Sequence, residues 1–230
     1  IFRPGEEVTQ VSESGRLVTA HTRSRKKISG EVLLYAVGRN GVTKGLGLDA
    51  IGLRTNQRGR LKVNCHYQTA IPHIYAVGDV VGFPALASTS MEQGRIAVRH
   101  ALGVDDQAIA SLLPYCLFTI PEISMVGKTE EELTQASVPY EVGLARYKET
   151  ARGQIIGDRR GTLKLLVHSE TRKLLGVHII GQGAAELVHI GQVAIALGGT
   201  LDFLVNNPFN YPTLAECYRI AALDAFNKLT

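Results

Sequence analysis

Residues 69–97 read TAIPHIYAVGDVVGFPALASTSMEQGRIA, and this stretch decides how the rest of the chain is interpreted. Its run Ile74–Val77 is short and apolar, as a buried strand is, and it ends at Gly78 and Asp79. After a turn, residues 86–102 predict a helix with Ser88, Thr89 or Ser90 as candidate caps. The stretch therefore predicts a strand, a Gly-Asp turn and a helix in close succession.

That succession favours a ligand site. In open α/β sheets, ligands lie beyond the carboxyl ends of the strands. Gly78 would let the backbone approach a ligand, and the Asp79 carboxylate could accept a bond from a sugar-type hydroxyl. The unpaired N–H groups at a helix start attract electron density. An aspartate after a strand is also commonly a cap or a turn former, so the local residues leave both interpretations open.

The whole chain predicts an α+β fold, with strands grouped first and helices last. We expect strands at 7–11, 15–20, 27–37, 60–63, 74–77, 115–119, 122–126, 140–146, 162–168 and 174–180. We expect further helices from 128, at 184–197, at 200–205 and at 214–229, with Thr129 capping the first of them. A change of character near 102–114 indicates a domain boundary.

The composition is typical of a globular protein, with 45% hydrophobic and 20% charged residues and a net charge of +4 over 230 residues. The one basic cluster, Arg23–Lys27, precedes an apolar run and predicts a hairpin turn rather than a nucleic-acid patch. No run approaches the roughly 20 apolar residues of a membrane span. With no signal-peptide pattern at its start, the chain is expected to be cytoplasmic and to bind neither nucleic acid nor membranes.

The cysteines and histidines suggest neither redox nor metal chemistry in this chain. The three cysteines stand far apart, with no CxxC pair, and are expected to be buried structural thiols: Cys65, Cys116 and Cys217. The seven histidines show no metal-ligand spacing. We therefore expect no metal site.

Residues 69–97 closely resemble the second flavin-binding segment of the pyridine nucleotide–disulfide oxidoreductases, the flavoprotein group of dihydrolipoamide dehydrogenase and glutathione reductase. Residues 32–40, VLLYAVGRN, are similar to the strand that returns from that family's NAD(P) domain. Residues 118–122 and 125–130 resemble the opening of its dimerisation domain, and residues 176–181 and 184–187 resemble the middle of that domain. The resemblance covers essentially the whole chain, in the family's order.

The resemblance implies three domain parts. Residues 1–40 would be the end of an NAD(P)-binding domain, residues 41–110 the end of an FAD-binding domain, and residues 111–230 an α+β dimerisation domain. The implied cofactors and substrates are FAD, NAD and NADP, and the implied partner is a second copy of the chain, in a homodimer or larger homo-oligomer.

The resemblance also assigns binding residues. Gly78 and Asp79 would approach FAD, with the carboxylate on a ribityl hydroxyl. The backbone at Leu86, Ala87 and Ser88 would face the flavin pyrimidine ring, where the helix dipole stabilises negative charge. Gly38 and Arg39 would lie near the path of the nicotinamide dinucleotide. Tyr211, in the loop 206–216, would lie where one subunit meets its partner's flavin.

Two features of the family are missing from this sequence. No GxGxxG opens a βαβ unit, and no redox cysteine pair is present. In the family, both nucleotide fingerprints and the disulfide precede the part seen here. Because the chain also begins Ile1-Phe2-Arg3, we expect a fragment that neither holds FAD nor turns over by itself, and we place no catalytic residue in it.

The loop 206–216, NNPFNYPTLAE, departs from the disulfide reductases of the family. Those enzymes carry a proton-shuttling histidine directly before the Pro-Thr of this loop, whereas this chain has Tyr211. A phenol with a pKa near 10 is a poor shuttle at pH 7. The loop instead resembles that of the family's soluble transhydrogenase subgroup, in which hydride passes between NADPH and NAD⁺ through FAD. Locally, Thr213 and Glu216 have the spacing of a capping box.

Three other interpretations stay open at this point. The chain could act as a dimerisation module without catalysis of its own. It could instead belong to an enzyme like dihydrolipoamide dehydrogenase with an altered loop. A relationship to mercuric reductase is disfavoured, since those enzymes use a C-terminal cysteine pair and this chain ends in Asn227-Lys-Leu-Thr230.

Overall fold

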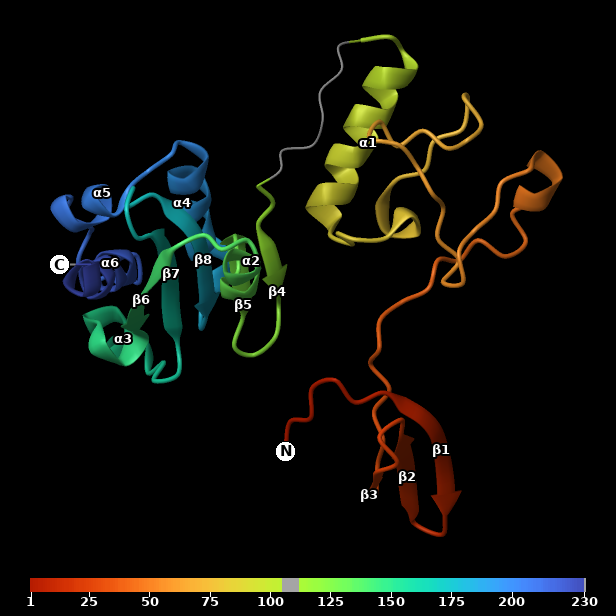
Figure 1. The fold of residues 1–230 in the computed structure, drawn as a ribbon, viewed down its shortest axis with the longest axis horizontal. Coiled ribbons are helices and arrows are strands. Elements are labelled where there is room, and N and C mark those ends of the chain that lie inside the picture. Colours follow the sequence, from red (N-terminus) through yellow and green to blue (C-terminus); the bar gives the residue numbers. More distant parts are fainter. Residues whose placement is uncertain (105–111, 230) are drawn as a thin grey trace. The chain divides into compact units, whose positions relative to one another are not determined.

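The computed structural model describes residues 1–104 and 112–229 (Figure 1). Contacts divide the chain into two compact units, residues 1–60 and residues 61–230, and each is described by itself. The three predicted domain parts, with limits at 40/41 and 110/111, stay a prediction.

The first unit begins with a three-stranded antiparallel sheet, drawn in red in Figure 1. Its strands are β1 Val8–Ser14, β2 Leu17–Thr22 and β3 Lys27–Gly30, paired in that order. The basic cluster forms the turn between β2 and β3, as predicted. There Arg23 pairs with Glu7 at 2.8 Å, and Lys26 pairs with Glu6 at 2.6 Å. The Lys26 ammonium, together with the Ser24 hydroxyl, lowers the pKa of the Glu6 carboxyl to about 2.

The predicted strand 27–37 is wrong beyond Gly30. Val32 and Leu34 are each 86% exposed, and no backbone group of 32–37 bonds to another residue in the part of the chain that the structure describes. A strand is stable only when a neighbour accepts its backbone bonds and covers its apolar side chains. The apolar run lacks both partners here.

Residues 41–60 form a loop held by two glycines. The Gly41 N–H donates to the Arg58 carbonyl at 2.7 Å, and a Cβ on Gly41 would lie 2.2 Å from the Gly59 carbonyl oxygen. Only glycine fits such a close approach of two backbones. The short 3₁₀ helix η1, Leu48–Ile51, lies within this loop.

Residues 61–104 include the stretch 69–97, and the two strands predicted in this part of the chain are wrong. Neither 60–63 nor 74–77 forms a regular strand; Tyr75 makes only an isolated bridge with Gln68. The chain folds back locally instead, with the Ala76 N–H donating to the Tyr67 carbonyl. The 3₁₀ helix η2, Gly78–Val81, follows, and then the helix α1, Ala87–Ala101, confirms the prediction at 86–102.

Residues 112–229 are built on a five-stranded antiparallel sheet in the order β4-β5-β8-β7-β6. The strands are β4 Tyr115–Leu117, β5 Ile123–Gly127, β6 Tyr140–Arg146, β7 Thr162–His168 and β8 Leu174–Ile180. The last three match the predicted bounds, while β4 ends two residues early and β5 begins and ends one residue late. The central strands β7 and β8 are nearly continuous apolar runs, which is typical of buried strands.

Helices cover one face of this sheet (Figure 1). Helix α4, Ala184–Ala196, packs on β5 and β8, and α6, Glu216–Leu229, packs on β6 and β7. The short helix α5, Leu201–Asn206, packs against α6. Helix α2, Glu130–Gln135, starts with the predicted capping box of Thr129 and Glu132. Helix α3, Ala151–Ile156, and the 3₁₀ helix η3, Tyr147–Glu149, were not predicted.

Tyr218 ties α6 to α4 inside the core. Its buried hydroxyl donates to the Leu187 carbonyl at 2.7 Å and accepts the Gly191 N–H at 3.0 Å. These two backbone groups would bond to each other in an undisturbed helix, so the hydroxyl is inserted into the ladder of α4. A Cβ on Gly191 would lie 3.1 Å from the same hydroxyl oxygen and still closer to Val177, so the close approach depends on glycine.

The capping box predicted at the start of the last helix is wrong. Helix α6 begins at Glu216 rather than 214, and the Thr213 hydroxyl donates back to the Asn210 carbonyl at 2.7 Å. Oε2 of Glu216 is buried and has no hydrogen-bond partner within the described residues. The loop bends back on itself before the helix, which takes the hydroxyl away from the N–H groups that it would cap.

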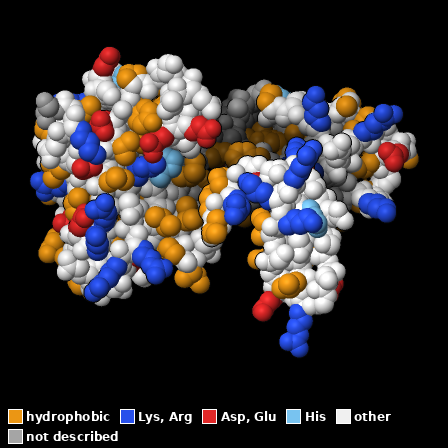
Figure 2. Space-filling view, turned by 60° about the horizontal axis from the view of Figure 1, so that its bottom comes forward, with side chains coloured by type: hydrophobic (Ala, Val, Ile, Leu, Met, Phe, Trp, Pro, Cys, Tyr) orange, Lys and Arg blue, Asp and Glu red, His pale blue; other side chains and the backbone are white. Residues whose placement is uncertain are grey.

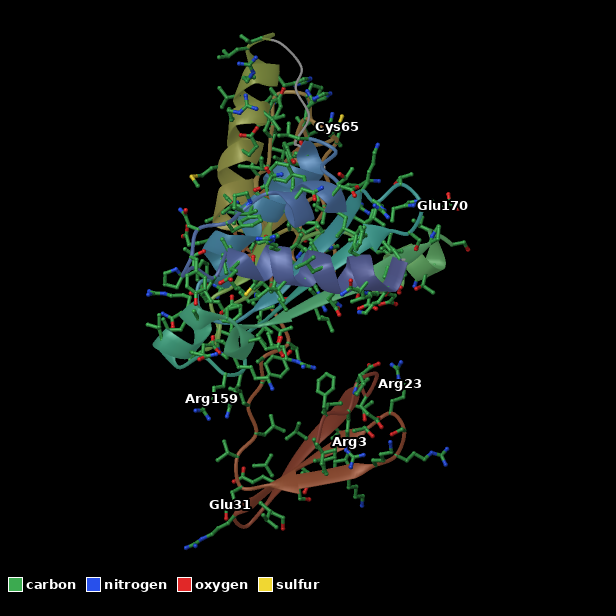
Figure 3. All side chains as sticks on the ribbon, turned by 90° about the vertical axis from the view of Figure 1, so that its left-hand side faces the viewer. Arg3, Arg23, Glu31, Cys65, Arg159 and Glu170 are labelled. Atoms are coloured by element: carbon green, nitrogen blue, oxygen red, sulfur yellow. The ribbon has the colours of Figure 1, made fainter. Side chains whose placement is uncertain are left out.

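The cysteines follow the prediction only in part. Cys217 is buried and Cys116 is partly buried, but Cys65, labelled in Figure 3, is exposed. Burial raises the pKa of the Cys217 thiol to about 12. Cys65 lies in an Asx turn whose Asn64 side chain accepts two backbone N–H groups, which holds residue 65 at the turn's outer edge.

Candidate functional site

The candidate site consists of two neighbouring pieces of residues 61–104: the Gly78-Asp79 turn and the start of α1. Gly78 has a φ of 80°, in the left-handed region that glycine adopts without strain. A Cβ there would lie 3.4 Å from the Ser90 hydroxyl oxygen, so the turn rests on the first turns of α1. The structure thus brings Gly78 and Asp79 next to the helix that Leu86, Ala87 and Ser88 begin.

The start of α1 carries no side-chain cap. Leu86 is the N-cap residue, and no side chain of residues 1–104 or 112–229 accepts the first N–H groups of the helix. The predicted caps are wrong: Ser88 lies inside the helix, Thr89 donates to the Pro84 and Leu86 carbonyls, and Ser90 donates to the Leu86 carbonyl. The N–H groups of the first turn are therefore available to a ligand, with the partial positive charge of the helix end behind them.

Asp79 and the first residues of α1 are also accessible. Asp79, Ala87 and Ser88 are exposed, and Leu86 is partly buried. The Asp79 carboxylate makes no hydrogen bond or ion pair with any residue that the structure describes, so it is available as an acceptor. A free carboxylate beside uncapped helix N–H groups suits one ligand that presents hydroxyls to the first and an electron-rich ring edge to the second.

The other predicted residues lie elsewhere. Gly38, with a φ of 101°, and the exposed Arg39 belong to the unit 1–60, which is described by itself. Tyr211 is 71% exposed in the loop between α5 and α6. The role of each as a site residue stays a prediction.

One residue of this site, Gln93, was not predicted from the sequence. Gln93 of α1 is 2% exposed, and its Oε1 accepts the Gly78 N–H at 2.7 Å. The signal was available, because Gln93 stands four residues after Thr89 and three before the apolar Ile96, on the helix face that turns inward. A polar residue on an apolar helix face needs a bonding partner, and the Gly-Asp turn supplies it.

The described residues show neither a basic patch on the face drawn in Figure 2 nor a metal-binding cluster. Lys and Arg side chains are spread over the face drawn in Figure 2 without forming one basic patch. Within the described residues, no group of three or more His, Cys, Asp or Glu side chains is arranged to hold a metal ion. Residues 1–104 and 112–229 contain no helix with the length and apolar character of a membrane span.

Comparison with protein families gives two matches that follow each other along the chain. Residues 1–94 match the pyridine nucleotide-disulphide oxidoreductases, and residues 113–222 match the dimerisation domain of the same family. The chain belongs to this family. The α+β fold, with the end of the FAD-binding part followed by the dimerisation domain, is the fold of these oxidoreductases, as the sequence predicted.

Two curated relatives carry the same name. The chain is 54% identical over 228 residues to the soluble pyridine nucleotide transhydrogenase of Mycobacterium bovis, covering 99% of this chain and 49% of the relative. It is 50% identical over 233 residues to the protein of the same name from Yersinia pestis, covering 100% of this chain and 50% of the relative. The chain thus spans about half the length of the curated relatives it matches.

Two solved structures have a similar fold. LpdA from Mycobacterium tuberculosis is 28% identical, with a TM-score of 0.76 over 95% of this chain and 48% of that one. The flavoprotein disulfide reductase RclA from Escherichia coli is 26% identical, with a TM-score of 0.81 over 94% of this chain and 50% of that one.

Proposed function

We propose that this chain supplies the C-terminal half of a soluble, FAD-dependent transhydrogenase that exchanges hydride between NADPH and NAD⁺. The observation that carries the proposal is the 54% identity to a soluble pyridine nucleotide transhydrogenase along 99% of the chain. Structures of disulfide reductases of the same fold are only half as similar in sequence, at 26% identity.

The Asp79 site would hold part of the FAD. The Asp79 carboxylate would accept a bond from a ribityl hydroxyl, and the uncapped N–H groups that follow Leu86 would face the electron-rich edge of the flavin pyrimidine ring. When bound, a flavin can accept a hydride from one dinucleotide and return it to another. The positive end of the α1 dipole would favour the added negative charge at that ring edge.

Tyr211 supports hydride exchange over disulfide chemistry. Reduction of a disulfide needs a group that moves a proton to and from a thiol near pH 7, and a phenol with an ordinary pKa near 10 does this poorly. The exposed Tyr211 stands where the family's disulfide reductases have their histidine. We infer that Tyr211 lies beside the flavin of a partner subunit and takes no part in proton transfer.

The remaining assignments follow from the same proposal. Gly38 and Arg39 would lie along the nicotinamide dinucleotide, and residues 113–222 would form the contact of a homodimer. The working compartment would be the cytoplasm. Without a GxGxxG fingerprint, the 230-residue chain should be inactive by itself.

The test is a chimera that joins the N-terminal half of the Mycobacterium bovis relative to this chain. We expect it to bind FAD and to reduce a chromogenic NAD⁺ analogue with NADPH. Lipoamide and glutathione disulfide serve as competing substrates. A chimera that reduces either disulfide but transfers no hydride between dinucleotides would refute the proposal.

A second candidate is a dimerisation module without catalysis. It is favoured by the core of residues 112–229, in which the sheet, η3 and the helices α4, α5 and α6 bury 18 residues in one cluster. Sedimentation of the 230-residue chain tests the module, because a stable monomer would contradict it.

A further inference from the structure

Gln93 joins the two pieces of the candidate site through one short bond. Its Oε1 accepts the Gly78 N–H at 2.7 Å, and only 2% of the residue is exposed. A buried amide costs free energy unless it is hydrogen-bonded, and the same is true of the backbone N–H that it accepts. Each group therefore needs the other.

The bond holds the residue directly before Asp79. Gly78 has a φ of 80°, whereas Val77 before it is extended, so the chain reverses its course at this glycine. Because the Gly78 N–H is fixed to α1, the backbone from which the Asp79 carboxylate projects is fixed to α1 as well.

The bond also sets a distance along the helix. Gln93 follows Leu86 by seven residues, and Ser90 lies between them on the same helix face, where it approaches Gly78. Helix side chains lean toward the N-terminus, so Gln93 reaches back toward Ser90, whose hydroxyl donates to the Leu86 carbonyl at 2.9 Å. The Gly-Asp turn is therefore held within about one helical turn of the N–H groups at the start of α1.

We propose that Gln93 is a positioning residue, which holds the Asp79 carboxylate at a set spacing from the uncapped start of α1 so that both bind one ligand. The inference rests on the proposed function, in which that ligand is FAD. In this proposal Gln93 contacts neither the ribityl chain nor the flavin ring. It sets whether Asp79 and the start of α1 can contact the same FAD molecule.

The test uses variants of the chimera described above. Gln93→Met keeps the length of the side chain and removes the acceptor, while Gln93→Glu keeps an acceptor. Gln68→Met is the matched control, because the Gln68 amide donates to the Pro72 carbonyl at 2.8 Å in the same part of the fold, away from Gly78. FAD affinity is measured by flavin fluorescence and stability by thermal unfolding.

We expect Gln93→Met to raise the Kd for FAD about tenfold, because one hydrogen bond no longer orders the site. Gln93→Glu should stay within about threefold of the unmodified protein, and Gln68→Met should lower the melting temperature without changing the Kd. An unchanged Kd in Gln93→Met, or equal losses in the Met and Glu variants, would overturn the inference.

A second measurement needs neither FAD nor a fully folded variant of the chimera. In the 230-residue chain, hydrogen exchange of the Gly78 amide should be slow and should speed up about tenfold in Gln93→Met. Fast exchange in the unmodified chain would refute the contact itself. If the chimera binds no FAD while the Gly78 amide is protected, the proposed function fails and the Gln93 contact stands.

Discussion

The strand β7 and the segment 32–37 are both mainly apolar, but only β7 is buried in a sheet. β7 reads TLKLLVH, and its Leu163, Leu165 and Leu166 are completely buried between two neighbouring strands and the helices. The segment 32–37 reads VLLYAV, and its Val32 and Leu34 are each 86% exposed without regular structure. An apolar run therefore indicates that a segment is stabilised by burial, and it forms a strand only where neighbouring strands or helices cover it.

The largest expected effect is the cost of truncating a leucine in each region. Leu165→Ala should lower the free energy of unfolding by ~2–5 kcal/mol, because it leaves a cavity in the core. Leu34→Ala should change it by less than ~0.5 kcal/mol, because an exposed side chain loses no packing. Urea denaturation followed by circular dichroism measures both. Similar losses in the two variants would mean that 32–37 is packed after all.

The same contrast explains how much of the fold the sequence could predict. The strands 140–146, 162–168 and 174–180 were predicted to the residue, because their apolar runs end in turn residues and their partners lie nearby in the chain. The strand 74–77 and the second part of the strand 27–37 were predicted from equally apolar runs, and neither forms. Nothing in a local pattern says that the neighbouring strand is missing from the described residues.

The candidate site shows a second limit. The turn at Gly78 and Asp79 and the helix after it could be predicted from turn and helix signals, although the strand expected before them was wrong; their role as a binding site stays a prediction. Gln93 could not be assigned to Gly78, because a contact across 15 residues depends on how the turn folds back. Likewise, the capping box of Thr129 formed as predicted while that of Thr213 did not, since the Asn210 carbonyl competes for the hydroxyl.

The second-largest expected effect is the loss of one buried hydroxyl, compared with the loss of an exposed one. Tyr218→Phe should lower the free energy of unfolding by about 1–3 kcal/mol, because the buried Leu187 carbonyl and Gly191 N–H lose the hydroxyl that bonds both. Tyr35→Phe is the control, since Tyr35 is 77% exposed and should tolerate the change. Equal stability of Tyr218→Phe and the unmodified chain would contradict this prediction. It would mean that the Gly191 N–H bonds directly to the Leu187 carbonyl in the variant, which a crystal structure would reveal.

The smallest effect concerns pH and again separates the sheet of residues 112–229 from the exposed first unit. Burial lowers the pKa of His178 on β8, and the Lys164 ammonium lowers it further, although the bond to the Lys128 carbonyl works in the opposite direction. Because the folded state holds this imidazole neutral, the unfolded state binds more protons below its pKa of about 6.5. Stability should therefore be complete above that pH and should decline as the pH falls through the lowered value.

The measurement is the urea midpoint of the chain between pH 7.5 and 5, with His178→Gln as the test and His21→Gln as the control. His21 lies on β2 of the first unit, where its ring contacts the Ser12 hydroxyl at 3.0 Å on an exposed surface. We expect His178→Gln to flatten the decline below pH 6.5 and His21→Gln to leave it unchanged. The opposite pattern would place the pH-sensitive histidine in the exposed unit and would show that the sheet of residues 112–229 does not exclude the charged form of His178.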